Sequence, residues 1–354
     1  MHSTTHNKRK IINDPVHGFI TIPDELIFDL IEHPFFQRLR RIKQLGMSHL
    51  VYPGANHTRF HHALGAMHLM TKAIDVLRSK NIEITDEERL GACIAILLHD
   101  IGHGPFSHTL EHSLLKNIHH EEVSLLFMQR LNQEFNGQLT LAIAIFSDTY
   151  HKSFLHQLVS GQLDMDRLDY LQRDSYFTGV SEGVVGSERI ITMLNVMDNN
   201  LVIDEKGIYS IENFIGSRRI MYWQVYMHKT VVSSEFMLTS ILKRAKDLYA
   251  QGMDLFASPS LKIFLKGDVT IDQFRNDLSM LENFALIDDS DISTSIKVWQ
   301  SCEDKILAYL CREIATRRLF KTKISREAFS AKQIEDKKAD IQKKLGITEA
   351  ETKY

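Results

Sequence analysis

Cysteine, proline and long apolar segments are all scarce in this chain of 354 residues. The three cysteines (Cys93, Cys302 and Cys311) have no CxxC spacing, which argues against a disulfide framework and against a zinc site built from cysteines. The most apolar run, Leu90–Leu98, is far too short to span a bilayer. The first residues lack the apolar segment of a signal peptide. We therefore expect a soluble protein of the reducing cytoplasm.

An excess of charge of one sign is also missing. The chain has 42 Lys and Arg against 45 Asp and Glu, a net charge of −3, so it carries no overall field that would attract nucleic acid. An anionic ligand must then be held by local groups. Apolar residues make up 44% and charged residues 25%, which excludes a wholly disordered chain. The length predicts two domains, or one large domain with appendages.

The six prolines leave long stretches uninterrupted, and apolar residues recur there at helical period. Alternation around Gly207 predicts one small β-hairpin over Leu201–Ile211. Rossmann and P-loop glycine motifs are absent from the sequence. The fold class is therefore predicted to be mainly α. The helices are expected at Pro34–Leu45, His61–Ser79, Asp86–Leu98, Glu121–Leu131, Leu139–Phe146, Ile211–Ala250 and Glu303–Arg318.

Histidine is concentrated in one stretch, because ten of the 18 histidines lie between residues 57 and 120. At its centre, His99-Asp100 ends a strongly apolar helix, where a terminus leaves polar atoms exposed to a ligand. A bare His-Asp pair is expected about once by chance in such a composition, so this setting carries the argument. Gly102 and Gly104 follow, and we expect them to let the backbone approach that ligand closely. The pattern indicates a metal or acid–base site.

Several further motifs accompany this pair in a fixed order. His62 lies in Arg59-Phe-His-His-Ala-Leu-Gly65, and Asp166 lies in Asp164-Met-Asp-Arg-Leu-Asp-Tyr-Leu-Gln-Arg-Asp174. The other segments are Ile12–Gly18, Phe36–Arg40, Ile42–Gly46, Tyr52–Phe60 and Asp100–His108. Together they resemble the HD-domain deoxynucleoside triphosphate triphosphohydrolases (dNTPases), which include the SAM-and-HD-domain enzymes, over about residues 10–240.

The resemblance implies an HD-domain helical fold with a small β-hairpin and a C-terminal helical extension. It divides the chain into an N-terminal arm at 1–25, which would serve an interface or regulation, a catalytic core at 26–250, and a mainly helical region at 251–354. It also implies four metal ligands: His62, His99, Asp100 and Asp166. Two imidazoles and two carboxylates suit a hard or borderline divalent ion such as Mn, Fe, Mg or Zn. Spacing alone does not separate His61 from His62, but the resemblance favours His62.

The same resemblance assigns catalytic groups. His108 and Glu111 are three residues apart on an expected helix, so the carboxylate would orient the imidazole and raise its pKa. In the family this pair transfers a proton at the scissile ester. His103 and His120 match phosphate-contacting positions, with His119 as an alternative to His120.

Substrate-binding positions follow in the same way. Three arginines match residues that bind the polyphosphate, although the family often has lysine where Arg167 stands. Three further residues match sugar-contacting positions, and Tyr226 would stack or close on the nucleoside. These positions are Arg59, Arg167 and Arg218 for the phosphates, and Gln44, Tyr170 and Asp174 for the sugar.

The implied activity is metal-dependent cleavage of a dNTP to a deoxynucleoside and tripolyphosphate. The alternative is an HD-domain nucleotidase or phosphodiesterase acting on another nucleotide. A third possibility, from a different class, is an HD module that binds nucleotides and regulates a partner without turnover. An alarmone hydrolase is disfavoured because Ile101–Gly104 replaces the acidic pair expected after His-Asp.

Regulation is implied as well, by a dNTP or NTP activator bound at the subunit interface of a homotetramer or dimer. Glu32 stands where the guanine-reading relatives have aspartate, so guanine is not fixed as the activator base. Neither nucleic acid nor a membrane is expected as a partner. The residues implied in the activator site are Lys10, Asn13, Asp14, Glu32, Gln37 and Arg40.

Overall fold

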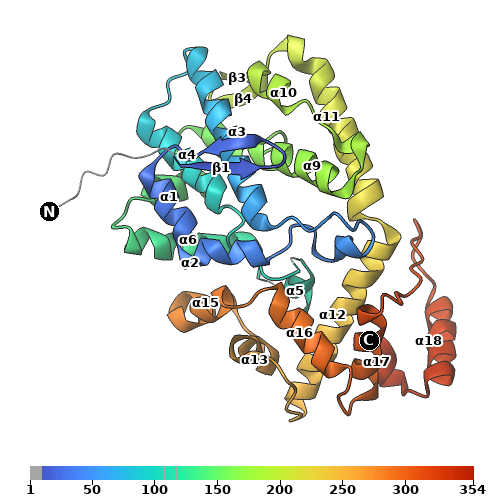
Figure 1. The fold of residues 1–354 in the computed structure, drawn as a ribbon. Coiled ribbons are helices and arrows are strands. Elements are labelled where there is room, and N and C mark those ends of the chain that lie inside the picture. The colour runs from blue at the N-terminus through green and yellow to red at the C-terminus, as the bar shows by residue number, and fades with distance from the viewer. Residues whose placement is uncertain (1–9, 107, 116–117) are drawn as a thin grey trace.

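The computed structural model describes residues 10–106, 108–115 and 118–354, and the side chains of His108, Glu111 and His112 lie outside that description. Most of the chain is helical, with two small antiparallel hairpins (Figure 1). The predicted mainly α class is therefore confirmed. In the described part of the chain, no helix combines the length and apolarity that crossing a membrane requires.

Three helices build the central layer. They are α3 (Arg59–Ser79), α4 (Asp86–Leu98) and α9 (Met165–Thr178), and α3 packs against both of the others. The sequence of α4 explains its position: Thr85 and Glu88 form a reciprocal capping box, and the last turns, rich in Ile and Leu, are buried. The helix α9 is capped by Asp164 and ends at Gly179 with a positive φ of 75°.

Other elements surround this layer. The N-terminal hairpin of β1 (Ile11–Asp14) and β2 (Gly18–Thr21) lies across the same region as α3 and α9 in Figure 1. The remaining elements up to residue 207 are α1 (Glu25–Glu32), α2 (Pro34–Gln37), η1 (Arg38–Arg41), η2 (Gly46–Leu50), α5 (His108–Ser113), α6 (His120–Glu134), α7 (Thr140–Phe146), α8 (Ser153–Val159), η3 (Ser181–Gly183), α10 (Ser187–Met193), β3 (Leu194–Met197), β4 (Asn200–Ile203) and η4 (Glu205–Gly207).

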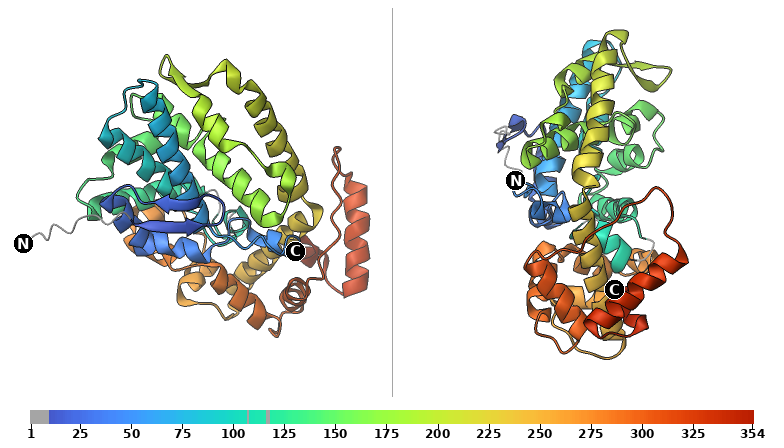
Figure 2. Two further views of the ribbon diagram at one scale, coloured as in Figure 1. Left: turned by 45° about the horizontal axis from the view of Figure 1, so that its top comes forward. Right: turned by 90° about the vertical axis from the view of Figure 1, so that its right-hand side faces the viewer.

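One long helix, α12 (Lys229–Ala250), links the central layer to the C-terminal elements. It contacts α5 and η2, and also α13 (Pro259–Lys266) and α17 (Lys305–Ala315) among the C-terminal elements (Figure 2). The helix α18 (Ala331–Leu345) has no buried residue. The elements after residue 207 are α11 (Ile208–Met221), the π-helical turn η5 (Tyr222–Tyr226), α12, α13 (Pro259–Lys266), α14 (Ile271–Asn276), α15 (Leu278–Ala285), α16 (Asp289–Trp299), α17 (Lys305–Ala315), α18 (Ala331–Leu345) and η6 (Glu349–Lys353).

Three expected elements differ in the structure. The single helix expected over Ile211–Ala250 is divided into α11, the π-helical turn η5 and α12, with a break at Met227 and His228. The helix predicted over Pro34–Leu45 ends early, because Ile42 and Gln44 pair instead with the backbone at residues 57–59. The predicted hairpin lies at 194–203 rather than 201–211, with both turn residues, Asp198 and Asn199, at positive φ. Gly207 precedes the helix α11 and is not part of a β-turn between strands.

Candidate metal centre and substrate cavity

The ends of three helices bring the predicted metal ligands together. His62 lies in the first turn of α3, His99 directly follows α4, and Asp166 lies in the first turn of α9. The crossing of α3 and α9 requires Gly65, because a Cβ there would lie 1.9 Å from Asp169 Oδ1. A larger residue at this position would separate the two helices that supply His62 and Asp166.

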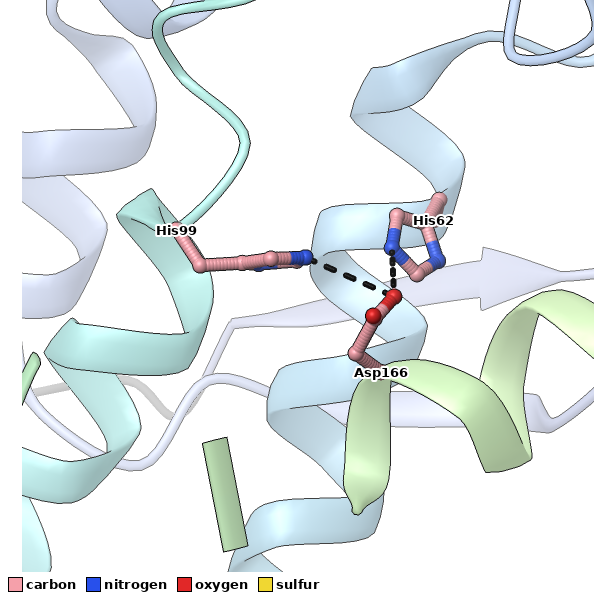
Figure 3. Close-up of side chains that lie close together, drawn as sticks. All are labelled: His62, His99 and Asp166. Atoms are coloured by element: carbon pink, nitrogen blue, oxygen red, sulfur yellow. Dashed lines mark ion pairs between the residues drawn. The ribbon is translucent and has the colours of Figure 1, made fainter. Parts of the chain in front are cut away.

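The four predicted ligands face a common point. Asp166 Oδ1 lies 3.1 Å from His62 Nε2 and 3.5 Å from His99 Nε2 (Figure 3). Asp100 Oδ1 lies 3.3 Å from His99 Nε2, and its Oδ2 lies 3.9 Å from His62 Nε2. His62, His99 and Asp166 lie close enough to one another to hold a divalent ion, whereas Asp100 groups in the same way with His103 and His120.

The hydrogen bonds of the two imidazoles fit such an ion. His62 Nδ1 bonds to Asp169 Oδ2 at 2.8 Å, and His99 Nδ1 donates to the carbonyl of Ile96 at 2.6 Å. Both Nε2 atoms are buried, and neither has a hydrogen-bond partner among the described residues. A metal-binding histidine typically uses one ring nitrogen to fix its orientation and leaves the other for the ion.

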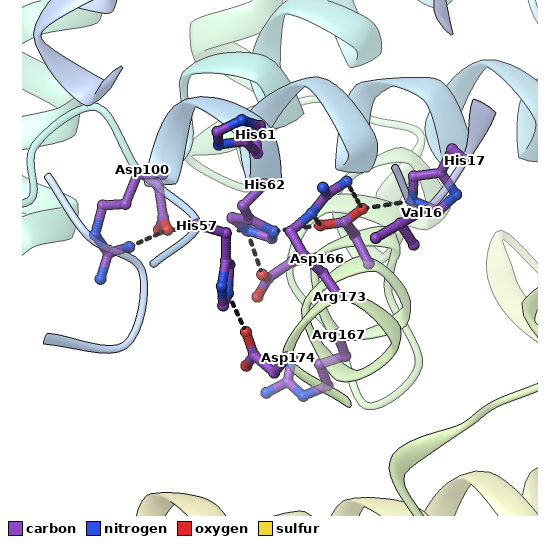
Figure 4. Close-up of polar contacts among 12 residues, drawn as sticks. Val16, His17, His57, His61, His62, Asp100, Asp166, Arg167, Arg173 and Asp174 are labelled. Carbon is purple, nitrogen blue, oxygen red and sulfur yellow. Dashed lines mark hydrogen bonds and ion pairs between the residues drawn. The ribbon is translucent and has the colours of Figure 1, made fainter. Parts of the chain in front are cut away.

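The neighbouring His61 is directed elsewhere. Its Nδ1 lies 2.9 Å from the hydroxyl of Thr58, where it helps to cap the start of α3. Figure 4 shows the ring of His61 pointing away from Asp166, which His62 faces. The alternative that spacing left open is thus separated by geometry: His62 faces the carboxylates and His61 caps its own helix.

The buried carboxylates and histidines of this centre shift one another's pKa values. Burial lowers the pKa of His62, but the adjacent carboxylates of Asp166 and Asp169 outweigh it and raise the pKa to about 10. Burial raises the pKa of Asp100, yet His99, His103 and Arg59 hold it well below its usual range. A cation is therefore favoured at this point, since the carboxylates stay ionised.

A second layer of contacts orients His62, and the sequence did not reveal it. Asp169 bonds to His62 with one oxygen and to His17 Nε2 with the other, at 2.6 Å. Arg173 is fully buried and pairs with both Asp169 and Asp14. The N-terminal hairpin is therefore joined to the metal centre. The available signal was the spacing of Asp169, three residues after Asp166 on one helix.

A cavity of about 390 Å³ opens beside these ligands. Its walls come from the segment 44–48, from the ends of the central helices, and from η5 and α12. Five of the seven predicted substrate residues line it, and of the three arginines assigned to phosphate only Arg59 does so. The lining residues are Gln44, Leu45, Gly46, Ser48, Arg59, Asp100, His103, Phe106, His120, Asp166, Tyr170, Asp174, Tyr222, Tyr226, Val231 and Glu235.

One end of the cavity carries an arginine and two histidines around the carboxylate of Asp100, and burial together with the charge of Arg59 holds the pKa of His103 well below its usual range. Arg59 forms a close ion pair with Asp100, and His103 Nε2 lies 3.3 Å from Asp100 Oδ1. The rings of His103 and His120 stack at 3.7 Å, whereas His119 is exposed at the start of α6. Asp100, His103 and His120 are themselves close enough to hold an ion. This end of the cavity suits a negatively charged group.

The other end combines aromatic rings with a carboxylate. The hydroxyl of Tyr226 donates to Asp174 Oδ2 at 2.7 Å, and His57 Nε2 lies 2.7 Å from Asp174 Oδ1. Tyr170 and Tyr226 meet edge to face with centroids 6.2 Å apart. Burial, followed by the charge of Asp174, raises the pKa of Tyr226 well above its usual range, so its hydroxyl stays protonated.

Other predicted residues lie apart from the cavity. Arg167 forms a close ion pair with Asp164, and the guanidinium of Arg218 lies 5.8 Å from the ring of Tyr222. Neither arginine belongs to the described lining. The predicted pair of His108 and Glu111 has side chains outside the described residues.

Gly102 and Gly104 are both closely packed by other segments of the chain. A Cβ on Gly102 would lie 2.3 Å from the carbonyl of His120, and one on Gly104 would lie 2.4 Å from Leu110. The close approach of their backbone to a ligand stays a prediction. The two glycines allow the segment after His99-Asp100 to pass close to the start of α6 and to α5.

The residues of the predicted activator site occupy the N-terminal arm and its neighbours. Asp14 is buried against Arg173, and the Lys10 ammonium lies 3.0 Å from the ring centroid of Phe28. Gln37 accepts a hydrogen bond from Arg40 at 2.8 Å. The exposed members of the set are Lys10, Asn13, Glu32 and Arg40.

Comparison with known proteins identifies two matching family models. The HD domain matches residues 59–174, and the HD associated region matches residues 185–255. Every ligand of the candidate metal centre lies within the first match. The helices α13 to α18 lie beyond both matched ranges.

Individual proteins extend the similarity over nearly the whole chain. A crystal structure of a phosphohydrolase from Bacteroides thetaiotaomicron is 56% identical, superposes with a TM-score of 0.95, and the match covers 98% of this chain and 86% of that one. An uncharacterised protein of Bacillus subtilis, YwfO, is 38% identical over 89% of this chain and 72% of its own length. The deoxynucleoside triphosphate triphosphohydrolase SAMHD1 homolog of Dictyostelium discoideum is 34% identical over 68% of this chain, which spans half of that protein's length.

Proposed function

This chain belongs to the dNTPase-like HD-domain family of phosphohydrolases, and on that premise we propose that it is a metal-dependent dNTP triphosphohydrolase. The observation that carries the proposal is the cavity beside the four metal ligands. One end offers Arg59, His103 and His120 to phosphate, and the other offers Tyr226 and Asp174 to a nucleoside. The two ends match the two halves of a nucleoside triphosphate.

The metal would be held by His62, His99, Asp100 and Asp166. When bound, a divalent ion neutralises phosphate charge and lowers the pKa of a coordinated water. Mn, Fe, Mg and Zn all suit this donor set, and manganese is the ion to test first.

The chain's own groups position the triphosphate and move the proton. Arg59 and His103 would hold the phosphates beside the ligands, with Arg167 and Arg218 reaching the distal phosphates from outside the described lining. Water adds to the α-phosphorus while the bond to the 5′ oxygen breaks. His108, oriented by Glu111, would protonate that oxygen as it leaves. The products are a deoxynucleoside and tripolyphosphate.

The nucleoside end favours deoxyribose and a stacked base. Asp174 is fixed between His57 and Tyr226, so its carboxylate and the adjacent Tyr170 would meet the sugar. Gln44 enters the cavity from the facing segment, and its Oε1 is buried without a hydrogen-bond partner in the described residues. A sugar hydroxyl is a suitable donor to it. Another nucleotide of similar size is the alternative substrate.

We further propose that the protein acts in the cytoplasm as a homotetramer or dimer with a nucleotide activator at its interface. The three cysteines are free, which fits a reducing compartment. Arg40 and Asn13 are exposed near the N-terminal hairpin, where a second subunit could complete a site with Lys10, Asp14, Glu32 and Gln37.

The test is an incubation with each dNTP and Mn²⁺ in ¹⁸O-labelled water. We expect free deoxynucleoside, with tripolyphosphate as the first phosphorus product by ³¹P NMR. The ¹⁸O should enter the tripolyphosphate, because water attacks phosphorus. Pyrophosphate or orthophosphate as the first product would assign the alternative activity on a nucleotide, and binding without turnover would assign a regulatory module.

Adjacent histidines supply a matched pair of variants. His62→Ala should lose both bound metal and activity while its helical CD spectrum is kept. His61→Ala should retain the metal and lose only about 1 kcal/mol of stability, since it removes a helix cap. Full activity of His62→Ala after chelation and metal add-back would refute the assignment.

A further inference from the structure

One carboxylate at the start of α16 bridges two distant segments of the chain. Asp289 is only 8% exposed. Its Oδ1 accepts a hydrogen bond from the backbone N–H of Phe106 at 3.1 Å, and its Oδ2 accepts one from the N–H of Lys43 at 3.0 Å. Both oxygens are thus committed to backbone amides that lie far from each other in the sequence.

Both of these segments form walls of the substrate cavity. Lys43 directly precedes Gln44, Leu45 and Gly46, and Phe106 ends the segment that carries His103. The two segments also lie side by side, since a Cβ on Gly46 would be 3.8 Å from the carbonyl oxygen of Phe106. A displacement of either amide would therefore move groups that face the substrate.

The conformation of Phe106 shows why an external contact is needed. Its φ is +52°, in the left-handed region that residues other than glycine adopt at a cost. Such a conformation persists where the surroundings hold it in place. The hydrogen bond from its N–H to Asp289 is one such restraint.

A buried arginine joins the same cluster. Arg38 donates from Nη1 to the carbonyl of Ile101 at 2.9 Å, and its guanidinium lies 5.1 Å from the ring of Phe284 on α15. Burial lowers the pKa of Arg38 to about 9, against the attraction of Asp288 and Asp289. Arg38 thus links the segment that follows His99-Asp100 to α15, in addition to the direct contact of Phe106 with Asp289 on α16.

We propose that Asp289 is a positioning residue, which holds the amides of Phe106 and Lys43 and thereby sets the distance between the His103 and Gln44 walls of the cavity. The helix α16 that supplies it lies outside both matched family regions. The region after residue 250 is then part of the catalytic unit. Only the expected loss of dNTP turnover rests on the proposed function, whereas the hydrogen-bonding role of Asp289 does not depend on it.

The chemistry of the side chain makes the inference testable with an isosteric change. A carboxylate has acceptors on both oxygens, whereas an amide has one acceptor and one N–H₂ donor. Asp289→Asn has the same shape but leaves one of the two backbone amides facing a donor. The matched control is Asp304→Asn, which alters the capping carboxylate of α17 and its ion pair with Arg244, away from the cavity.

The experiment compares hydrogen exchange, metal content and kinetics of the two variants with the wild type. In the wild type, the amides of Lys43 and Phe106 should be protected. Asp289→Asn should speed exchange in the segments 41–46 and 101–106, keep its bound Mn²⁺, and lower kcat/KM for a dNTP about ten- to a hundredfold. Asp304→Asn should lower the melting temperature without these local changes.

Two results would overturn the proposal. The first is free exchange of the Lys43 and Phe106 amides in the wild type, which needs no variant. The second is an Asp289→Asn profile that differs from the wild type only by uniform loss of protection, as for Asp304→Asn. If no nucleotide is turned over, the exchange measurements still decide the role of Asp289, while the proposed function alone fails.

Discussion

His62 and Asp169 form a buried hydrogen bond of 2.8 Å between Nδ1 and Oδ2, and this bond aims His62 Nε2 at Asp166. The same carboxylate binds His17 from the N-terminal hairpin and Arg173 from α9. One acidic side chain therefore connects the orientation of a metal ligand to the packing of the N-terminal arm. Loss of the hydrogen bond between His62 and Asp169 should therefore lower the affinity of the protein for its metal ion.

We predict that Asp169→Asn weakens Mn²⁺ binding about 10- to 100-fold, the usual effect of losing a group that orients a ligand. The dissociation constant would be measured by calorimetry on the metal-free protein at a temperature where CD shows it folded. Asp14→Asn is the control, because it breaks the other pair of Arg173 and leaves His62–Asp169 intact. Equal metal affinity in the two variants would contradict an orienting role for Asp169.

The proton transfer predicted for His108 and Glu111 has its own kinetic test. Glu111→Ala should lower kcat by about 10² to 10⁴, the usual effect of removing positioned acid–base catalysis, while the metal remains bound. A substrate with a better leaving group than the 5′ hydroxyl should be less affected, because it needs less protonation. An equal loss for both substrates would place Glu111 in binding rather than in proton transfer.

Local signals in the sequence were sufficient for much of the catalytic layer. The helix α4 was predicted over Asp86–Leu98 and is found there, because its capping box and its apolar run act within a few residues. The helix ends at Leu98, so His99 and Asp100 follow directly at its C-terminus. The small hairpin lies at 194–203 rather than at the predicted 201–211, because the two-residue turn that joins its strands is Asp198-Asn199, with both residues at positive φ, and not the segment around Gly207.

Contacts between distant segments could not be predicted in this way. The helix expected over Pro34–Leu45 ends where Ile42 pairs with the backbone of Arg59, a tertiary contact that overrides helical periodicity. The roles of Asp169 and Asp289 depend on what packs beside each helix. Asp289 carries no local signal that separates it from an ordinary capping aspartate, and the one signal for Asp169 is its spacing of three residues from Asp166.

Regulation through the N-terminal arm gives a further prediction. Arg40 is exposed, and its guanidinium lies 3.6 Å from the ring centroid of Phe60. If a dNTP binds there, it should shift the protein toward a tetramer and raise its rate on a second dNTP, since an activator must favour the active assembly. Arg40→Ala should abolish this activation and keep the metal, whereas Arg275→Ala on α14 should leave it unchanged. Sedimentation and rates that do not respond to any dNTP, singly or in pairs, would refute the activator site.

The carboxyl of Asp289 should also make stability depend on pH. Burial raises its pKa to about 6, although the amides of Lys43 and Phe106 and the charge of Lys43 lower it, while Asp288 raises it further. The native state therefore binds this proton more tightly than the unfolded chain, where the pKa is about 3.9. Its contribution to the free energy of unfolding is present below about pH 4 and is lost as the pH rises to about 6, by about 3 kcal/mol. Asp289→Asn lacks this titration, so the wild type should lose stability relative to the variant over that window in urea unfolding. A difference that stays constant, or that grows in favour of the wild type as the pH rises, would contradict the raised pKa.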